Sequence, residues 1–228
     1  MGFSDHPSEG QDGARQRRRF AFIGGHLALD FTNSLGGRRG GSTREMVATY
    51  ADLVAWGLQA GMVVADEAHW LLDAAQRDPA RAAMVVARAR ELREAVYTLI
   101  TARMRGEITP GVDLALLNSE LALAVAHRRL AISDHGHDLV WVWDWRQERA
   151  MAVAAPADLT LDALLWPLAV AAADLLSRRS ERPPIRQCAS DECSWLYLDT
   201  TRNHSRRWCD MKGCGNKAKV RRYRQRQP

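Results

Sequence analysis

The chain has 228 residues, 46% of them hydrophobic, and a formal net charge of +5 at pH 7. Its longest apolar candidate, residues 161–176, is interrupted by Asp162, Pro167 and Asp174, so a membrane-spanning protein is excluded. Residues 1–13 are polar and lack the apolar stretch of a secretion signal, which predicts a cytoplasmic chain.

Residues 1–19 are predicted to be a flexible basic tail. Arg15, Arg17, Arg18 and Arg19 crowd its end, with Ser, Gly and Pro among the residues before them. That composition is typical of a solvated segment. A second arm that contacts phosphate is the alternative.

Capping residues mark helix starts in the body of the chain, residues 20–179. Thr49 and Asp52 have the spacing of a capping box, for a helix that Gly61 closes. Asp66 is expected to cap a second helix that extends to about residue 77.

The longest predicted helix begins at Asp78-Pro79, an N-cap followed by proline at the first helical position. It is expected to extend to Arg105 and to end at Gly106. Its inward-facing residues are expected to be Met84, Leu92, Val96, Leu99 and Ile100.

A further helix is predicted around Leu114, Leu117 and Leu121, followed by a β-hairpin of residues 130–132 and 139–145. Trp141, Trp143 and Trp145 alternate along the second strand, as a core or dimer-burying stripe or as an aromatic ligand wall. Pro167 is expected to kink or delay a last helix, residues 161–177. The body is therefore expected to be a mainly α domain, α+β through one small hairpin.

His26, Asp30 and Asn33 lie at spacings that bring them together on a helix. Either they fix the start of that helix, or they line a small-molecule pocket. We expect no enzymatic activity. At His204, between the cysteine pairs, a nuclease role would need an open metal position and acidic partners that the sequence does not show.

All four cysteines lie in the last forty-one residues, as Cys188-x4-Cys193 and Cys209-x4-Cys214 with fifteen residues between the pairs. Two close pairs are typical of a tetrahedral four-thiolate zinc site. Another metal or redox-active thiols are the alternative. Disulfides are less favoured still, since thiols stay reduced in a cytosolic chain. A four-cysteine site has no open coordination position, so the sequence predicts one structural Zn2+.

The segment that holds the cysteines is strongly basic. Residues 182–228 contain twelve Lys or Arg and four Asp or Glu, a net charge of +8, while the remaining chain carries −3. This asymmetry is typical of a module that binds a polyanion; a solubilising tail is the alternative. Residues 180–184 are expected to form a short, stiff linker to the module, which spans residues 180–228.

Within this module residues 194–198 predict a short strand, and residues 217–227 predict a basic helix. Ala218, Val220 and Tyr223 would give the helix a thin apolar side that packs on the zinc core, as Trp195 and Trp208 would. The expected phosphate contacts are Arg202, Arg206, Arg207, Lys212, Lys217, Lys219, Arg221, Arg222 and Arg224.

Three motifs in this module resemble the CGNR zinc-finger family of bacteria. They are Asp199-Thr200-Thr201-Arg202-Asn203, Arg206-Arg207-Trp208-Cys209 and Met211-x2-Cys214-Gly215-Asn216-Lys217-Ala218-Lys219. Lys217 takes the place of the arginine for which that family is named, which keeps the charge but loses the planar bidentate fork. Residues 24–34 and Tyr50-x-Asp52-Leu53-x-x-Trp56 resemble the ABATE domain that accompanies this finger.

The resemblance implies a stress-induced bacterial transcription regulator in the cytoplasm, associated with the nucleoid. Its finger would bind DNA, and its N-terminal domain would sense a signal or form a homodimer. RNA binding is one alternative, since a basic four-cysteine module does not specify its nucleic acid. A small-molecule-binding domain that uses the finger for protein interaction is another.

Overall fold

A computed structural model describes residues 20–133, 135–147, 160–177 and 183–225. The predicted basic tail, residues 1–19, and residues 180–182 of the predicted linker lie outside the described residues. No helix in the described ranges is both long enough and apolar enough to span a lipid bilayer.

The described chain is mainly helical, as predicted. Its helices are α2 (Leu27–Thr32), α3 (Tyr50–Gln59), α4 (Ala65–Arg77), α5 (Pro79–Arg105), α6 (Gly111–Ala126), α7 (Asp144–Gln147), α8 (Leu165–Ser177) and α9 (Asn216–Arg224). Three antiparallel pairs of strands accompany them: β1 (Leu35–Gly37) with β2 (Thr43–Glu45), β3 (Arg128–Ile132) with β4 (Leu139–Trp143), and β5 (Ile185–Gln187) with β6 (Leu196–Leu198).

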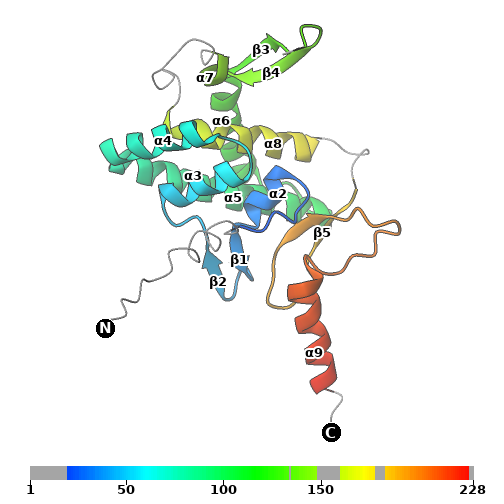
Figure 1. The fold of residues 1–228 in the computed structure, drawn as a ribbon. Helices are drawn as coiled ribbons and strands as arrows, with labels where there is room; N and C mark the ends of the chain where they lie inside the picture. Colours follow the sequence, from blue (N-terminus) through cyan, green and yellow to red (C-terminus); the bar gives the residue numbers. More distant parts are fainter. Residues whose placement is uncertain (1–19, 134, 148–159, 178–182, 226–228) are drawn as a thin grey trace, which may run out of the picture.

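Helix α5 is the centre of the body and packs against α2, α3, α4, α6 and α8 (Figure 1). Its buried side includes Val85, Leu92, Val96 and Ile100. The prediction for Met84 is wrong, because its side chain is 61% exposed. Met84 lies about 140° around the helix from the fully buried Ala89, on the side that faces solvent.

Local capping signals account for two of the three predicted helix starts. The Thr49 hydroxyl accepts from the Asp52 amide at 3.2 Å, and the Asp52 carboxylate accepts from the Thr49 amide at 2.9 Å. Asp78 caps α5 through the Arg81 amide at 3.0 Å. The prediction for Asp66 is wrong: α4 begins at Ala65, and the Glu67 side chain accepts from the Val64 amide at 2.8 Å.

The predicted hairpin is confirmed, with Leu130 opposite Trp141, but its tryptophans divide between two environments. Trp143 stacks on Trp145 with ring centroids 5.3 Å apart, and Trp145 is fully buried in α7. Trp141 is 58% exposed, so the predicted stripe does not form one buried face. Because β4 ends at Trp143, Trp145 belongs to α7 and does not follow the alternation of side chains along the strand.

Helix α8 begins late, as predicted from Pro167. A 3-10 turn, Leu161–Leu164, precedes its first residue, Leu165. Pro167 therefore falls in the first turn of the helix, where an amide has no intrahelical acceptor to lose. Helix α6 turns Leu117 into the core, whereas Leu114 is exposed.

The cysteine-rich segment packs directly on the N-terminal part of the body. Leu196 and Leu198 of β6 belong to the same buried apolar cluster as Leu29 of α2. The Asn33 amide group donates to the Leu196 carbonyl at 2.8 Å and accepts from the Leu196 amide at 2.8 Å. Two backbone bonds, from Leu198 to Gly24 at 2.8 Å and from Ser194 to Gly37 at 2.9 Å, extend the contact. The predicted domain boundary near residue 180 stays a prediction.

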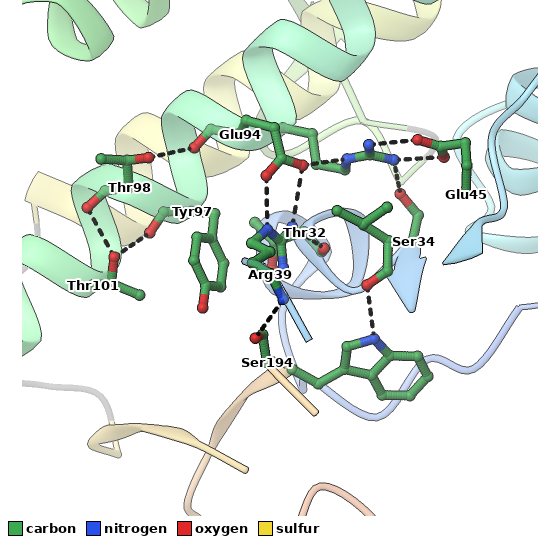
Figure 2. Close-up of polar contacts among 12 residues, drawn as sticks. Thr32, Ser34, Arg39, Glu45, Glu94, Tyr97, Thr98, Thr101 and Ser194 are labelled. Atoms are coloured by element: carbon green, nitrogen blue, oxygen red, sulfur yellow. Dashed lines mark hydrogen bonds and ion pairs between the residues drawn. The ribbon is translucent and has the colours of Figure 1, made fainter. Parts of the chain in front are cut away.

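An ionic network ties α5 to the same region (Figure 2). Arg93 is buried and donates to both carboxylate oxygens of Glu45, at 2.7 and 2.6 Å. Glu94 accepts from the Arg39 guanidinium at 2.7 Å, and the Arg39 backbone amide donates to the Ser194 hydroxyl at 2.9 Å. Burial opposes ionisation of both glutamates, but the arginines hold the pKa of each below its usual value.

Candidate metal centre and nucleic-acid interface

The four cysteines converge on one point. Cys188 follows β5, Cys193 precedes β6, and Cys209 and Cys214 come from the second cysteine pair. All four sulfurs lie within 4.8 Å of one another, with Cys193 and Cys209 at 3.7 Å and Cys209 and Cys214 at 3.6 Å. Tetrahedral zinc with Zn–S bonds of about 2.3 Å needs sulfurs about 3.8 Å apart. The cluster therefore fits one structural zinc.

Aromatic and apolar side chains enclose this cluster. Cys188, Cys193 and Cys209 are buried with Tyr197, and Trp195, Trp208 and Ile23 pack against them. The packing expected for Trp195 and Trp208 is confirmed. Ile23 comes from the N-terminal part of the chain, so the body contributes to the wall of the metal site.

The electrostatics of the sulfur cluster favour a cation. Hydrogen bonding to the Cys188 sulfur, burial and the negative charge at Cys188 raise the pKa of Cys193 to about 12. Hydrogen bonding to the Cys188 and Cys193 sulfurs, burial and the negative charge of these two sulfurs raise the pKa of Cys209. Without a cation the four thiols cannot all ionise together, so zinc binding at this site is coupled to the release of protons.

Asp199 organises the loop between the two cysteine pairs, a role that the sequence did not predict. Its buried carboxylate accepts from the Thr201 hydroxyl at 2.6 Å, the Thr201 amide at 3.1 Å and the Arg206 amide at 3.0 Å. Burial opposes ionisation, but these hydrogen bonds hold the pKa of Asp199 below its usual value. The Asp-Thr-Thr spacing, a carboxylate two residues before a hydroxyl, was the available signal.

Arg206, expected to contact phosphate, is used inside the finger instead. Its guanidinium lies 4.1 Å from the centre of the Tyr197 ring and donates to the Trp208 carbonyl at 3.0 Å and to the Cys209 carbonyl. The Tyr197 hydroxyl in turn donates to the Arg206 carbonyl at 2.7 Å. Arg206 therefore holds the second cysteine pair in place.

Gly215 lies against the end of the flexible Met211 side chain. It is buried at the end of a π-helical turn, Met211–Gly215, and a Cβ there would lie 2.9 Å from the Met211 sulfur. Asp210 caps this turn by accepting from the Gly213 amide at 2.7 Å. The turn leads without a break into α9, so the orientation of α9 is set by the backbone that carries Cys214.

Helix α9 points away from the body (Figure 1). The apolar side expected to pack on the zinc core does not do so, because Val220 is 49% and Tyr223 65% exposed; Ala218 alone of the three is partly buried. Most of the predicted phosphate contacts are exposed on α9 and the loops beside it: Arg202, Arg207, Lys212, Lys217, Lys219, Arg222 and Arg224. Arg221 is half-buried.

His26, Asp30 and Asn33 come together on and beside α2, as their spacing predicted. The His26 ring accepts from the Ala28 amide at 3.3 Å and so caps the helix, while Asp30 accepts from the Gly24 amide at 2.7 Å. Asn33 holds Leu196 of the finger. Their polar atoms therefore fix backbone segments, and a small-molecule pocket at these residues stays a prediction.

Asp30 is expected to make stability depend on pH. Burial raises its pKa to about 6, against the opposing effect of the Gly24 and Ile23 amides. The folded chain therefore binds the proton more tightly than the unfolded chain, whose Asp pKa is about 3.9, and stability falls as pH rises between these values. The loss is at most about 3 kcal/mol.

Urea unfolding of the wild type and of Asp30→Asn at pH 4 and pH 7.5 measures this effect. The difference in unfolding free energy between the two proteins should change with pH in favour of the variant at pH 7.5. A difference that is the same at both pH values would show that burial does not perturb Asp30.

Comparisons with known families agree with this architecture. A family model named ABATE, described as "Putative stress-induced transcription regulator", matches residues 25–179, and a model described as "CGNR zinc finger" matches residues 185–227. No curated protein matches the chain. Because the first model covers more than half of the 228 residues, the chain belongs to the ABATE family and carries a CGNR zinc finger in its C-terminal part.

Proposed function

We propose that this protein is a bacterial transcription regulator that binds duplex DNA through α9 and the loops beside it. The observation that carries the proposal is a basic helix with no buried residue, continuous with a turn that holds a zinc ligand. Such a helix is presented to solvent in a fixed orientation without a large apolar contact of its own. Arg and Lys side chains along it can neutralise successive phosphates and release condensed counterions.

The phosphate contacts in this proposal are Arg202, Arg207, Lys212, Lys219, Arg222 and Arg224, with Lys217 and Arg221 closer to acidic neighbours. Arg207 also lies 5.3 Å from the centre of the Trp208 ring, which keeps its guanidinium near the surface of the finger. The four reduced thiols suit a cytoplasmic protein, and the proposed DNA binding would associate it with the nucleoid.

A non-enzymatic role is part of the proposal. Four thiolates complete the coordination of zinc and leave no position for a reactive water. The metal centre would then serve to hold α9, Arg206 and the loop organised by Asp199 in one arrangement.

Small-molecule binding by the α-rich body is a second candidate function, favoured by one cavity. A groove of about 630 Å³ lies between α3, α4 and α5, and its lining includes Tyr50, Leu72, Ala82, Val86 and Arg90. Its volume is within the range of sites for small organic ligands. In this proposal a ligand in the groove would be the signal, and the contact between α2 and β6 would carry it toward the finger.

Selection from a random duplex-DNA library tests the proposal. Zinc-loaded full-length protein should enrich a defined sequence, and the same protein stripped of metal should not; a palindromic sequence would add a homodimer. Binding that depends on zinc but enriches no sequence, together with tighter binding of a matched RNA duplex, would favour the RNA alternative. Absence of binding to DNA or RNA at low salt would contradict the proposal and leave the body as the functional part.

A further inference from the structure

Two acidic side chains beside the first cysteine pair contact the basic helix. Asp191 and Glu192 lie in the loop between Cys188 and Cys193. Asp191 is 2.5 Å from the Arg221 guanidinium, and Glu192 is 3.4 Å from both the Arg221 guanidinium and the Lys217 ammonium group. Two of the bases on α9 therefore have acidic partners from another part of the finger.

The two bases with acidic partners lie on one side of α9. Successive residues are about 100° apart around a helix, so Lys217 and Arg221 are neighbours, whereas Lys219 lies about 160° from Arg221. Arg222, about 140° from Lys217, falls on the side toward Lys219. Arg224, about 20° from Lys217, lies on the side of the paired bases but at the C-terminal end of the helix, beyond Arg221. Within the described residues, neither Lys219 nor Arg222 has an acidic group at salt-bridge distance.

The acidic residues are accessible to a ligand. The side chains of Asp191 and Glu192 are 84% and 62% exposed. Ion pairs this exposed add little to folding stability, because water competes for both partners. Asp191 and Glu192 do, however, place two negative charges beside Lys217 and Arg221. A phosphate that approached these two bases would be repelled by the neighbouring carboxylates.

We propose that Asp191 and Glu192 act as an acidic clamp on Lys217 and Arg221, so that nucleic acid approaches α9 from the side of Lys219 and Arg222. The clamp lowers the attraction of the finger for phosphate in general and makes the side of Lys219 and Arg222 the main binding side of the helix, with Arg224 still exposed at the C-terminal end of α9. This inference rests on the proposed nucleic-acid binding of the finger, and it names the residues that would orient the nucleic acid on α9.

Neutralising the clamp tests this directly. The variant Asp191→Asn/Glu192→Gln should bind nonspecific duplex DNA more tightly than the wild type. The slope of log affinity against log salt concentration should become steeper by about 1 to 2, because up to two further phosphates are neutralised. The control, Asp73→Asn/Glu107→Gln, makes the same change in net charge on the exposed surface of the body. It should leave the slope unchanged.

A second pair of variants compares the two sides of α9 at equal loss of charge. Lys219→Ala/Arg222→Ala should lower the salt slope by about 2, whereas Lys217→Ala/Arg221→Ala should lower it by less than about 1. In the background of Asp191→Asn/Glu192→Gln, the Lys217→Ala/Arg221→Ala change should also lower the slope by about 2. Circular dichroism and zinc content verify that every variant keeps its finger.

The outcomes separate the clamp from the proposed function. If the wild type binds DNA and the clamp variant has the same slope as its control, the clamp is wrong and the function stands. Equal effects of the two helix variants would likewise overturn the clamp. If neither the wild type nor the clamp variant binds any nucleic acid at low salt, the proposed function is wrong and the clamp with it.

Discussion

Replacing Cys209 by serine is expected to unfold the zinc finger and to destabilise the α-rich body as well. Cys209 is buried, and its sulfur lies 3.7 Å from that of Cys193 and 3.6 Å from that of Cys214, so the substitution removes one of the four sulfurs of the cluster. Structural zinc contributes on the order of 10 to 16 kcal/mol to the folding of finger peptides. The finger has few other buried residues that could offset this loss.

The effect on the body follows from the position of β6. Leu196 and Leu198 belong to the main apolar core, and each buried leucine contributes roughly 1.5 to 3 kcal/mol. Losing both from the core would lower the unfolding free energy of the body by about 3 to 6 kcal/mol.

Thermal unfolding by circular dichroism, with zinc and with chelator, measures both parts of this effect. Ser205→Ala, an exposed change in the same finger, should retain the wild-type melting temperature and zinc content. Intact C-terminal structure in metal-free Cys209→Ser would contradict the zinc site. A body whose melting temperature is unchanged by the variant would contradict its dependence on β6.

Asn33→Ala is expected to weaken the contact between the body and the finger. The alanine would leave the Leu196 amide and carbonyl without their side-chain partner, in a position where Leu196 is fully buried. An unsatisfied buried polar group costs roughly 1 to 3 kcal/mol, so the two together would lower stability by about 2 to 6 kcal/mol.

Urea unfolding of full-length, zinc-loaded protein measures this loss. Asn118→Ala removes the same side chain from an exposed position of α6 and should have little effect. Limited proteolysis adds a structural readout. If Asn33→Ala releases the finger, the variant should be cut near residue 183 faster than the wild type. Equal stability of the two variants would show that the Asn33 bonds do not hold the finger.

Much of the fold could be predicted because its signals are local. Thr49 and Asp52, or Asp78 and Pro79, determine a helix start within four residues, and the spacing of the cysteines limits them to a small number of metal geometries. The sequence predicts the wrong cap for α4 because two acids are adjacent there. The one that caps is Glu67, which reaches back to the Val64 amide, while Asp66 lies inside the first turn.

The arrangement of the site was harder to predict, because it depends on contacts between distant residues. Asn33 and Leu196 are 163 residues apart, and an asparagine that satisfies a distant backbone looks in the sequence like one that ends a helix. Arg206 belongs to a run of basic residues, and only the Tyr197 ring and the carbonyls around it distinguish this arginine from its neighbours. The charges of a basic segment predict its ligand class but not which charges face the ligand.

The backbone bonds from Leu198 of β6 to Gly24 and from Ser194, just before β6, to Gly37 have a consequence for how this finger can be moved between proteins. Its smallest self-contained form is discontinuous in sequence, because the wall of its metal site and the apolar partners of β6 come from residues 20–39. Moving the cysteine-rich segment alone into another protein would therefore expose the apolar side chains of Leu196 and Leu198. Fusions and domain swaps should therefore move residues 20–39, which hold α2 and β1, together with the finger.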